Sequence, residues 1–205
     1  MKKILALVLA RKNSKRLKNK NLLMLSGKPL ITWTLDTLNK KEVRNQFIDI
    51  IVSTDSLKIK NLSKKYEFLA PWLRPKKLSG SKASSEAAAI HALNWYEKKF
   101  QKIDGIFLFQ PTSPFRSQKD IFLAIDLFQK NNKHVLSVCK KKTYKFNVND
   151  INGSLYLMPT NILRKFKNFE RNGFIKINMS RYRDNIDIDT IHDMKIARKI
   201  LTSNN

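Results

Sequence analysis

The stretch ILALVLA, residues 4–10, is a continuous aliphatic run that ends abruptly in polar and cationic residues. Such a run is typical of a parallel strand that helices bury on both faces. The alternative is a secretory signal peptide, whose apolar segment would then be at the short limit of about 7 residues. Because a basic loop follows where a small-residue cleavage site belongs, we predict a buried first strand and a cytoplasmic protein.

Short apolar runs and longer amphipathic stretches alternate along the rest of the chain. Residues 27–40 carry apolar side chains at helical spacing behind Pro29, which suits the first turn of a helix. This alternation predicts a doubly wound α/β fold with a mostly parallel sheet, formed as a single domain over residues 1–205. Further strands are predicted at about 47–55, 103–110, 134–139, 153–159, 174–179 and 185–190, and further helices at 56–66, 84–100, 118–131, 160–167 and 191–201.

The formal net charge of +25 suggests a polyanion binder, but its distribution argues against a dedicated nucleic-acid site. The 31 lysines and 10 arginines are spread along the whole chain instead of forming one stripe with interleaved aromatics. Such charge attracts nucleic acid only nonspecifically, at low salt. No apolar run approaches the ~18 residues that span a bilayer, so no membrane contact is predicted. The single cysteine, Cys139, agrees with a reducing compartment.

The loop after the first strand is strongly basic, with six cations between Arg11 and Lys20. In open α/β sheets ligands lie beyond the carboxyl ends of the strands, and a loop between a strand and a helix there commonly holds phosphates. The loop matches neither the P-loop nor the dinucleotide-binding glycine pattern. From the residues alone, a phosphate site and a solvated charged turn remain equally open.

A pair of acids near the carboxyl terminus could complement these cations. In NIDIDT, residues 185–190, the carboxylates of Asp187 and Asp189 project from one face of an extended segment. Two such groups suit Mg²⁺, which takes one or two carboxylates together with substrate phosphate oxygens. The alternative is that both acids pair with lysines on an exposed strand.

Seven blocks of sequence follow one another along most of the chain: LARKNSKRLKNKNL, GKPLI, IIVSTDS, LRPKKLSGSKASSEAAAIHAL, QPTSPFRS, NGSLY and IDIDT. In this order they closely resemble the acylneuraminate cytidylyltransferases, the enzymes that make CMP-sialic acid and its bacterial relatives. The resemblance implies a Rossmann-like nucleotidyltransferase fold of three layers, with CTP and a nonulosonic (sialic-acid-like) sugar acid as substrates and Mg²⁺ as the metal.

The resemblance also implies roles for individual residues. Arg11, Lys20 and Asn21 match residues that bind the CTP phosphates, and Lys15 is expected as a further contact. Arg74 and the backbone of Ala83 match the cytosine site, Ser85 a phosphate contact, and Gln110 the wall between nucleotide and sugar. Asp187 and Asp189 match the metal-binding acids, and Arg11, Lys20 and Asp189 are therefore the residues expected to carry catalysis.

Two departures from the family pattern concern the turn and the acceptor side. The basic loop lacks the family's usual glycine, so we expect Asn13 to take up the left-handed conformation. The connection at about 140–153 is much shorter than in the family, where it contributes to the acceptor pocket and to a dimer contact. Lys145, Asn152 and Tyr156 are the expected acceptor-binding residues, and a homodimer is implied by the family but not by this short connection.

The implied reaction is a direct displacement, in which the anomeric hydroxyl of the sugar acid attacks the α-phosphate of CTP. It yields a CMP-sugar and pyrophosphate without a covalent enzyme intermediate. The alternatives are a cytidylyltransferase for a different acidic sugar or polyol, and a non-catalytic nucleotide-binding homologue.

Overall fold

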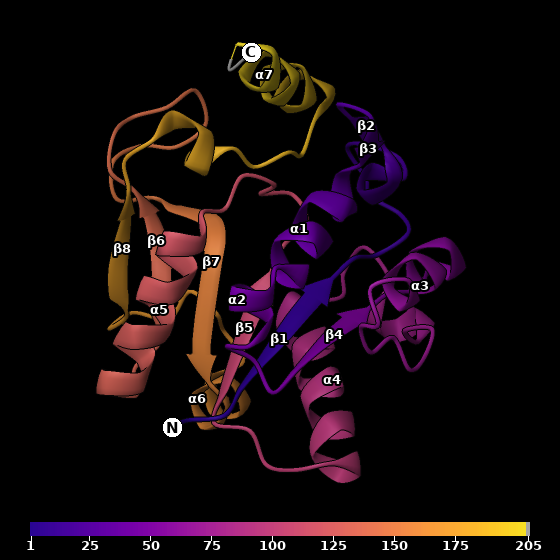
Figure 1. Cartoon of the computed structure of the whole chain (residues 1–205), viewed down its shortest axis with the longest axis vertical. Helices are drawn as coiled ribbons and strands as arrows, with labels where there is room; N and C mark the ends of the chain where they lie inside the picture. Colours follow the sequence, from indigo (N-terminus) through magenta and orange to yellow (C-terminus); the bar gives the residue numbers. More distant parts are fainter. Residues whose placement is uncertain (204–205) are drawn as a thin grey trace.

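The computed structural model describes residues 1–203, which form a six-stranded sheet between two layers of helices (Figure 1). The strand order is β4-β1-β5-β7-β6-β8, and β7 alone runs antiparallel to its neighbours. The predicted mostly parallel α/β sheet is therefore confirmed. The strands are β1 (Ile4–Leu9), β4 (Asp49–Ser53), β5 (Gly105–Phe109), β6 (Val135–Cys139), β7 (Ile151–Pro159) and β8 (Ile175–Met179), and β2 (Met24–Leu25) and β3 (Lys28–Pro29) form a separate hairpin.

Every helix expected from the sequence is present, with boundaries within a few residues of the expectation. Three 3₁₀ helices and the single-turn helix α2 are additional, because elements this short leave little hydrophobic periodicity in a sequence. The helices are α1 (Leu30–Asn39), α2 (Lys41–Arg44), α3 (Leu57–Lys64), α4 (Ser85–Lys99), α5 (Gln118–Asn131), α6 (Thr160–Phe166) and α7 (Ile191–Thr202), and the 3₁₀ helices are Lys20–Leu22, Lys76–Leu78 and Tyr182–Asn185.

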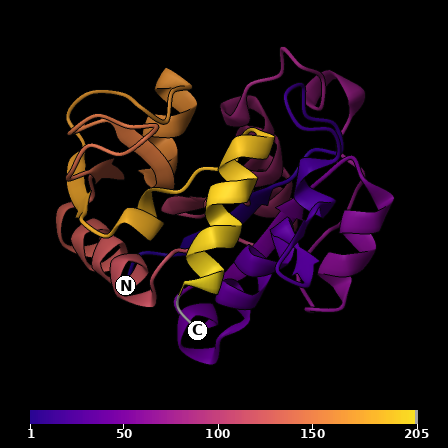
Figure 2. The ribbon, with the colours of Figure 1, turned by 90° about the horizontal axis from the view of Figure 1, so that it is seen from above.

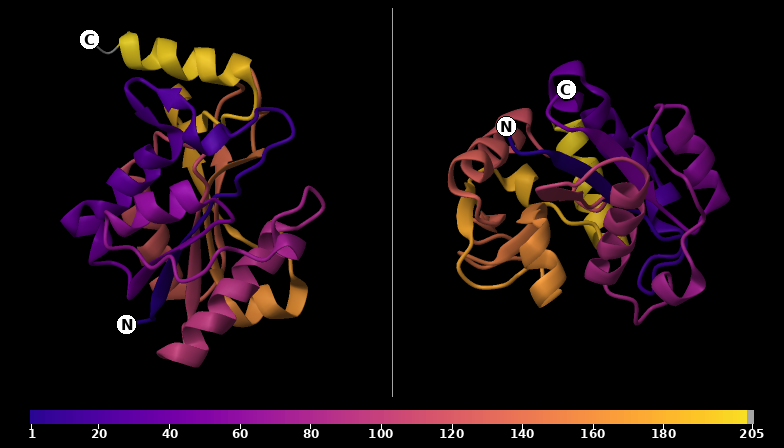
Figure 3. Two further views of the ribbon diagram at one scale, coloured as in Figure 1. Left: turned by 90° about the vertical axis from the view of Figure 1, so that its right-hand side faces the viewer. Right: turned by 90° about the horizontal axis from the view of Figure 1, so that it is seen from below.

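The aliphatic run of β1 is buried on both faces, as predicted. Its even-numbered residues, such as Ala6 and Val8, face a cluster that includes α1 and α5, while Leu5 and Leu7 face α4 and α6. Figure 3 shows the sheet between these layers, with α4 and α6 on the side opposite α1. A strand in this position has to be apolar at successive residues, which explains the absence of alternation in its sequence.

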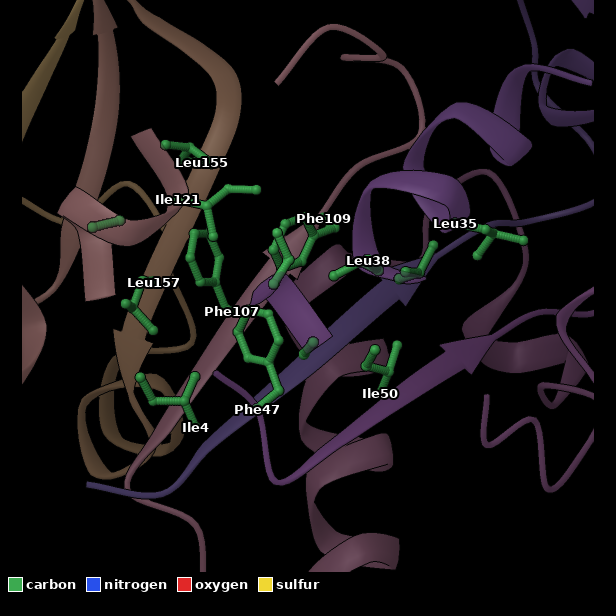
Figure 4. Close-up of a cluster of buried hydrophobic side chains, with 14 of the residues drawn as sticks. Ile4, Leu35, Leu38, Phe47, Ile50, Phe107, Phe109, Ile121, Leu155 and Leu157 are labelled. Atoms are coloured by element: carbon green, nitrogen blue, oxygen red, sulfur yellow. The ribbon is translucent and has the colours of Figure 1, made fainter. Parts of the chain in front are cut away.

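Three phenylalanines fill the centre of the face under α1 and α5 (Figure 4). Phe107 and Phe109 on β5 stack at 4.5 Å between ring centroids, and the ring of Phe47 meets both edge-on at 5.9 and 5.7 Å. Offset-stacked and edge-to-face pairs are the favoured aromatic arrangements. This packing fixes β5, whose carboxyl end leads into the candidate site.

A third cluster lies beyond the carboxyl ends of the parallel strands, where α7 crosses the molecule (Figure 2). Met194 and Ala197 of α7 pack there with Leu25 of the β2–β3 hairpin. Ile186 and Ile188 are buried in the same cluster. The sequence predicted a strand over 185–190, and this is wrong. Residues 186–189 belong to no strand, because the hydrogen bond of Ile188 N–H goes to the carbonyl of Thr112 in a loop.

The connection between β6 and β7 spans residues 140–150, since β7 already begins at Ile151. Residues 151–153, predicted to be part of the connection, belong to the strand. Within residues 1–203 we find no helix with the length and apolar character needed to cross a membrane.

Candidate functional site

A cleft opens at the carboxyl ends of β1 and β5, where ligands are expected in an open α/β sheet. Its volume of about 250 Å³ is close to the lower end of the range of about 300–1,000 Å³ for small-molecule sites. Seven of the sequence-predicted site residues line it: Arg11, Lys20, Asn21, Arg74, Ala83, Ser85 and Gln110.

The basic loop forms one wall of the cleft, and side chains hold its backbone in place. The side-chain amide of Asn21 donates to the backbone carbonyl of Arg11 at 2.9 Å, and the backbone N–H of Lys12 donates to the carboxylate of Asp55 at 2.6 Å. The left-handed residue is Asn19, with φ of 53°, and not Asn13 as expected. Asn19 directly precedes the 3₁₀ helix that begins at Lys20, so the sharp turn is needed at the end of the loop.

The cations of this loop differ in position. Lys20 is buried, Arg11 is partly buried and reaches the carbonyl of Gly80 at 3.4 Å, and both line the cleft. Lys15 is exposed and lies outside the lining, so the structure does not bring this predicted contact to the cleft. The neighbouring Arg16, which the sequence reading did not single out, points to Asp189 instead.

Arg74 is the most unusual group in the cleft. It is 7% exposed, yet its Nε and Nη2 atoms have no hydrogen-bond partner in the described structure. Burial lowers the pKa of Arg74, as does the charge of Arg11, while Asp55 raises it. A buried donor without a partner costs free energy, so this guanidinium is poised for an acceptor that a ligand would supply.

The amino terminus of α4 forms the opposite wall. The side chain of Ser84 caps the helix by accepting the N–H of Ala87 at 3.1 Å, which leaves the exposed Ser85 at the first helical position. Ala83 precedes the cap, and its N–H is used in a turn with Gly80. The positive end of the helix dipole therefore faces the cleft, as suits a phosphate.

The loop after β5 forms a third wall of the cleft, and Arg116 holds this loop in place. The guanidinium of Arg116 donates to the carbonyls of Gln110 and Ser154 and to the hydroxyl of Thr34, the last at 3.2 Å. Sequence reasoning missed this residue as an organiser, because its partners come from three separate elements. It also missed Thr112, a buried hydroxyl that lines the cleft and has no partner in the described structure.

Asp187 and Asp189 lie together beside the basic loop. Asp189 accepts from Arg16 at 2.8 Å, from Lys20 at 2.9 Å and from Lys145 at 3.2 Å. Burial would raise the pKa of Asp189, but the hydrogen bonds and charges of Lys20 and Lys145 outweigh it and hold that pKa well below its usual value. Lys20 thus joins the cleft to the acidic pair, and Asp189 is fully ionised at neutral pH.

Asp193, which the sequence reading did not select, fixes the turn that carries these acids. Its carboxylate accepts the backbone N–H groups of Asp189 and Thr190, both at 2.8 Å, while Thr190 caps α7 by accepting the N–H of Asp193. This is a capping box, and its signature of threonine followed three residues later by an acid is present in the sequence.

The three residues predicted for the acceptor lie in different surroundings. The ammonium of Lys145 is 2.6 Å from Asp187, so this residue joins the acidic pair. The hydroxyl of Tyr156 donates to Glu170 at 2.9 Å. Tyr156 Oη and Gln110 Oε1 each lie 3.9 Å from the position that a Cβ atom would take at Gly153, so Tyr156 and Gln110 are near neighbours.

Asn152 is the predicted residue that the structure does not bring to the site. It is 1% exposed, its amide nitrogen donates to Asn185 at 2.8 Å, and its oxygen accepts from the hydroxyl of Ser137 and the N–H of Ser154. These bonds use the polar atoms of the side chain and tie β6 and β7 to the 3₁₀ helix Tyr182–Asn185. Asn152 therefore has a structural position behind the acceptor side.

Comparison with known proteins gives a consistent result. A family model described as "Cytidylyltransferase" matches residues 5–187. The CMP-N,N'-diacetyllegionaminic acid synthase of Legionella pneumophila is 30% identical over 233 residues, which cover 98% of this chain and 97% of that protein. The N-acylneuraminate cytidylyltransferase of Escherichia coli is 34% identical over 185 residues, covering 89% of this chain and 39% of that protein.

Solved structures resemble the fold at lower sequence identity. The structure described as CMP:2-keto-3-deoxy-manno-octonic acid synthetase complexed with CTP has a TM-score of 0.72 at 12% identity and covers 99% of this chain and 100% of its own. A cytidylyltransferase of Leptospira borgpetersenii has a TM-score of 0.70 at 20% identity, covering 99% of this chain and 88% of its own. These two matches establish the Rossmann-like nucleotidyltransferase fold.

Proposed function

We propose, from the premise that the chain belongs to the cytidylyltransferase family, that it transfers CMP from CTP to the anomeric hydroxyl of a nonulosonic sugar acid and releases pyrophosphate. The observation that carries this proposal is the single cleft in which the unpartnered guanidinium of Arg74, the cations Arg11 and Lys20, and the amino terminus of α4 converge. Through Lys20, the cleft continues to the acidic pair Asp187 and Asp189.

The cleft suits the two ends of CTP. Arg74 has two free donors, which match the carbonyl oxygen and ring nitrogen acceptors of cytosine. Arg11, Lys20 and Ser85 would hold the phosphates, and Asn21 fixes the loop through its bond to Arg11. As the α-phosphate is attacked, charge develops on the phosphoryl oxygens and on the pyrophosphate, and fixed cations stabilise that charge.

Asp187 and Asp189 fit the Mg²⁺ that the family resemblance implies. Their carboxylates lie on one side of a fixed segment, and the depressed pKa of Asp189 keeps this ligand ionised. Within residues 1–203 no group of three or more His, Cys, Asp and Glu is arranged to hold a metal, so an ion at this pair would take its remaining oxygens from the substrate or water. Bound there, Mg²⁺ would neutralise phosphate charge.

The acceptor would lie between Gln110 and Tyr156, on the β7 side of the cleft. Lys145, whose ammonium lies 2.6 Å from Asp187, would bind the carboxylate of the sugar acid, and Gln110 would contact both substrates. The Legionella relative, which this chain matches over nearly its full length, supports a nonulosonic acid of the legionaminic type as the first acceptor to test. The structure offers no side chain that we assign as a general base.

The experiment that tests this function is pyrophosphate release from CTP with Mg²⁺, run against a panel of nonulosonic acids. The panel includes N,N'-diacetyllegionaminic, N-acetylneuraminic and pseudaminic acids, together with 2-keto-3-deoxy-manno-octonic acid and a control without acceptor. We expect release with at least one nonulosonic acid and none without an acceptor. Pyrophosphate release only with the octonic acid would show that the acceptor is not a nonulosonic acid. CTP binding without pyrophosphate release with any of the acids would indicate a non-catalytic homologue.

Two further expectations from the sequence remain proposals. The buried thiol of Cys139, which is not in a disulfide, supports a reducing compartment such as the cytoplasm. A homodimer is the family expectation, and sedimentation of the purified chain would test it directly.

A further inference from the structure

The ammonium group of Lys145 sits among the oxygen atoms of the acidic pair. Its Nζ lies 2.6 Å from the carboxylate of Asp187, 2.7 Å from the backbone carbonyl of the same residue and 3.2 Å from the carboxylate of Asp189. Asp193 is also near, at 3.8 Å. A single positive charge is thus surrounded by oxygens, the ligand type that divalent cations of the Mg²⁺ class prefer.

Lys145 reaches this position from the short connection between β6 and β7, residues 140–150. Its neighbour Tyr144 donates its hydroxyl to Asp193 at 3.0 Å. The other hydrogen bonds of the connection are local or go to β6 and β8, such as those of Asn149 N–H to the carbonyl of Cys139 and of Lys140 N–H to that of Met179. Two consecutive side chains therefore attach the connection to the acidic segment.

We propose that Lys145 is an internal counter-ion that competes with the divalent cation for Asp187 and Asp189. This inference rests on the proposed function, because it assumes that these two acids ligate the metal. An ammonium group donates to the same lone pairs that a metal ligand must offer, and two cations on one pair of carboxylates repel each other. Lys145 must therefore leave the carboxylates before they can bind the metal.

Two consequences follow for the protein. Without metal, Lys145 is the cation shared by Asp187 and Asp189, in addition to the pairing of Asp189 with Arg16 and Lys20, and it helps to hold the connection 140–150 in place. With metal bound, the connection keeps only the Tyr144 attachment to this segment, and the freed ammonium becomes available beside the acceptor side of the cleft. Metal binding and the position of this connection are thereby linked.

The test is a titration with Mn²⁺, followed by the electron paramagnetic resonance signal of the free ion, on the full chain without substrates. Lys145→Met should bind Mn²⁺ at least about tenfold more tightly than the wild type, because it removes a unit charge about 3 Å from the ligand oxygens. Lys145→Arg keeps the charge and should stay near the wild-type affinity. Lys142→Met makes the same change in net charge at an exposed position of the same connection and should leave the affinity unchanged.

Asp189→Asn separates failure of this inference from failure of the metal assignment. Loss of Mn²⁺ binding in Asp189→Asn, together with tighter binding in Lys145→Met alone, supports the proposal. If Asp189→Asn loses the ion but Lys145→Met binds it no more tightly than the wild type, the competition is overturned and the metal site stands. If Asp189→Asn binds Mn²⁺ as the wild type does, the metal assignment fails, and the inference with it.

Thermal unfolding provides a readout that also reports whether the variants fold. Removing Lys145 leaves neighbouring carboxylates without their shared cation, so Lys145→Met should melt at a lower temperature than the wild type without metal. Millimolar Mn²⁺ should then raise its melting temperature more than it raises that of the wild type, since an ion that binds only the folded state stabilises it according to affinity. An equal or smaller increase would overturn the proposal.

Discussion

Individual residues in the cleft show how burial assigns roles that charge alone does not. Lys15 and Lys20 look alike in the sequence, yet Lys20 is buried between the cleft and Asp189 while Lys15 is exposed. Arg74 has no acidic neighbour in sequence to suggest a role, and its importance comes from two buried donors that have no partner in the described structure. At this scale, the polar groups left unsatisfied mark the site.

Arg11 gives the most direct test of the phosphate assignment. Arg11→Ala should reduce kcat/KM for CTP by about 100-fold or more, because it removes a fixed charge at the place where charge develops. The assay is pyrophosphate release at saturating acceptor. Lys12→Ala is the matched control, since its side chain is exposed and the contact of this residue with Asp55 uses the backbone. Equal rates for Arg11→Ala and the wild type would contradict the phosphate assignment and show that the basic loop is a solvated charged turn.

Asp189 should also make the free energy of unfolding depend on pH in the acidic range. The lysine partners lower the pKa of its carboxyl in the folded state, so its contribution is fully present above the unfolded pKa of about 3.9 and disappears as the pH falls toward the folded value. Acidification from neutral pH to well below about pH 4 lowers the unfolding free energy of the wild type. In Asp189→Asn this decrease should be smaller by about 2 kcal/mol. Urea unfolding at several pH values measures it.

The control for this comparison is Asp126→Asn, which removes an exposed ion pair with Lys130 on α5. Exposed pairs of this kind contribute at most about 1 kcal/mol, so the acid dependence should stay near that of the wild type. An identical dependence in Asp189→Asn and the wild type would contradict the strong pairing of Asp189 with lysine.

At the scale of elements, the site depends on loops that rigid strands and helices hold in place. The loop after β5 is attached to β7 and α1 through Arg116, and the turn before α7 is fixed by the capping box of Thr190 and Asp193. The connection 140–150 is attached through Tyr144 and Lys145. Each loop is thus positioned by a polar side chain that spans two or more elements.

Arg116→Met should be strongly destabilising although Arg116 touches no predicted substrate atom. The change removes a charged donor from the carbonyl of the buried Ser154 and leaves the carbonyl of Gln110 with the N–H of Ser113 alone. A hydrogen bond to a charged group contributes about 1.5–3 kcal/mol. We expect a loss of about 3 kcal/mol or more in urea unfolding. Because Gln110 lines the cleft, kcat should fall as well in the fraction that folds.

Arg116→Lys separates the charge from the geometry. Lysine keeps the charge but cannot reach three acceptors in a plane as a guanidinium does. It should therefore recover only part of the stability. Full recovery by lysine would show that the charge of Arg116 matters and that its three directed bonds do not.

At the scale of the whole molecule, the third hydrophobic cluster joins the two ends of the chain over the site. α7 packs on the β2–β3 hairpin, and between them Ile186 and Ile188 anchor the segment that carries the two acids. The basic loop before the hairpin and the acidic segment before α7 therefore meet although more than a hundred residues separate them in sequence. Packing at the end of the sheet thus sets the distance between the cations of the basic loop and the acidic pair.

Met194 tests this link between packing and site. It is fully buried in α7, so Met194→Ala should cost about 2–4 kcal/mol, which lowers the melting temperature by roughly 5–15 °C in a chain of this size. We also expect weaker Mn²⁺ binding, because the acidic segment loses part of its support. Lys195→Ala, an exposed change on the same helix, should affect neither. Unchanged Mn²⁺ affinity in Met194→Ala would show that the capping box alone positions the acids.

The sequence by itself determined the fold class and most of the predicted residues that line the cleft, because both depend on local patterns. Short continuous aliphatic runs are typical of strands buried on both faces, and the polar residues that follow parallel strands meet at one edge of the sheet. The ordered motifs then selected Arg11, Lys20, Asn21, Arg74 and Gln110, which line one cleft.

Only the tertiary structure decided which polar groups are free and which are already bonded. Asn152 was expected at the acceptor but is saturated by Ser137, Ser154 and Asn185, and the ammonium of Lys145 is engaged by Asp187 and Asp189. These partners lie up to 44 residues away in the chain, so no spacing rule predicts them. Hydrogen bonding of buried groups is a property of the packed structure, because burial itself, which makes an unpaired group costly, arises only when the elements pack.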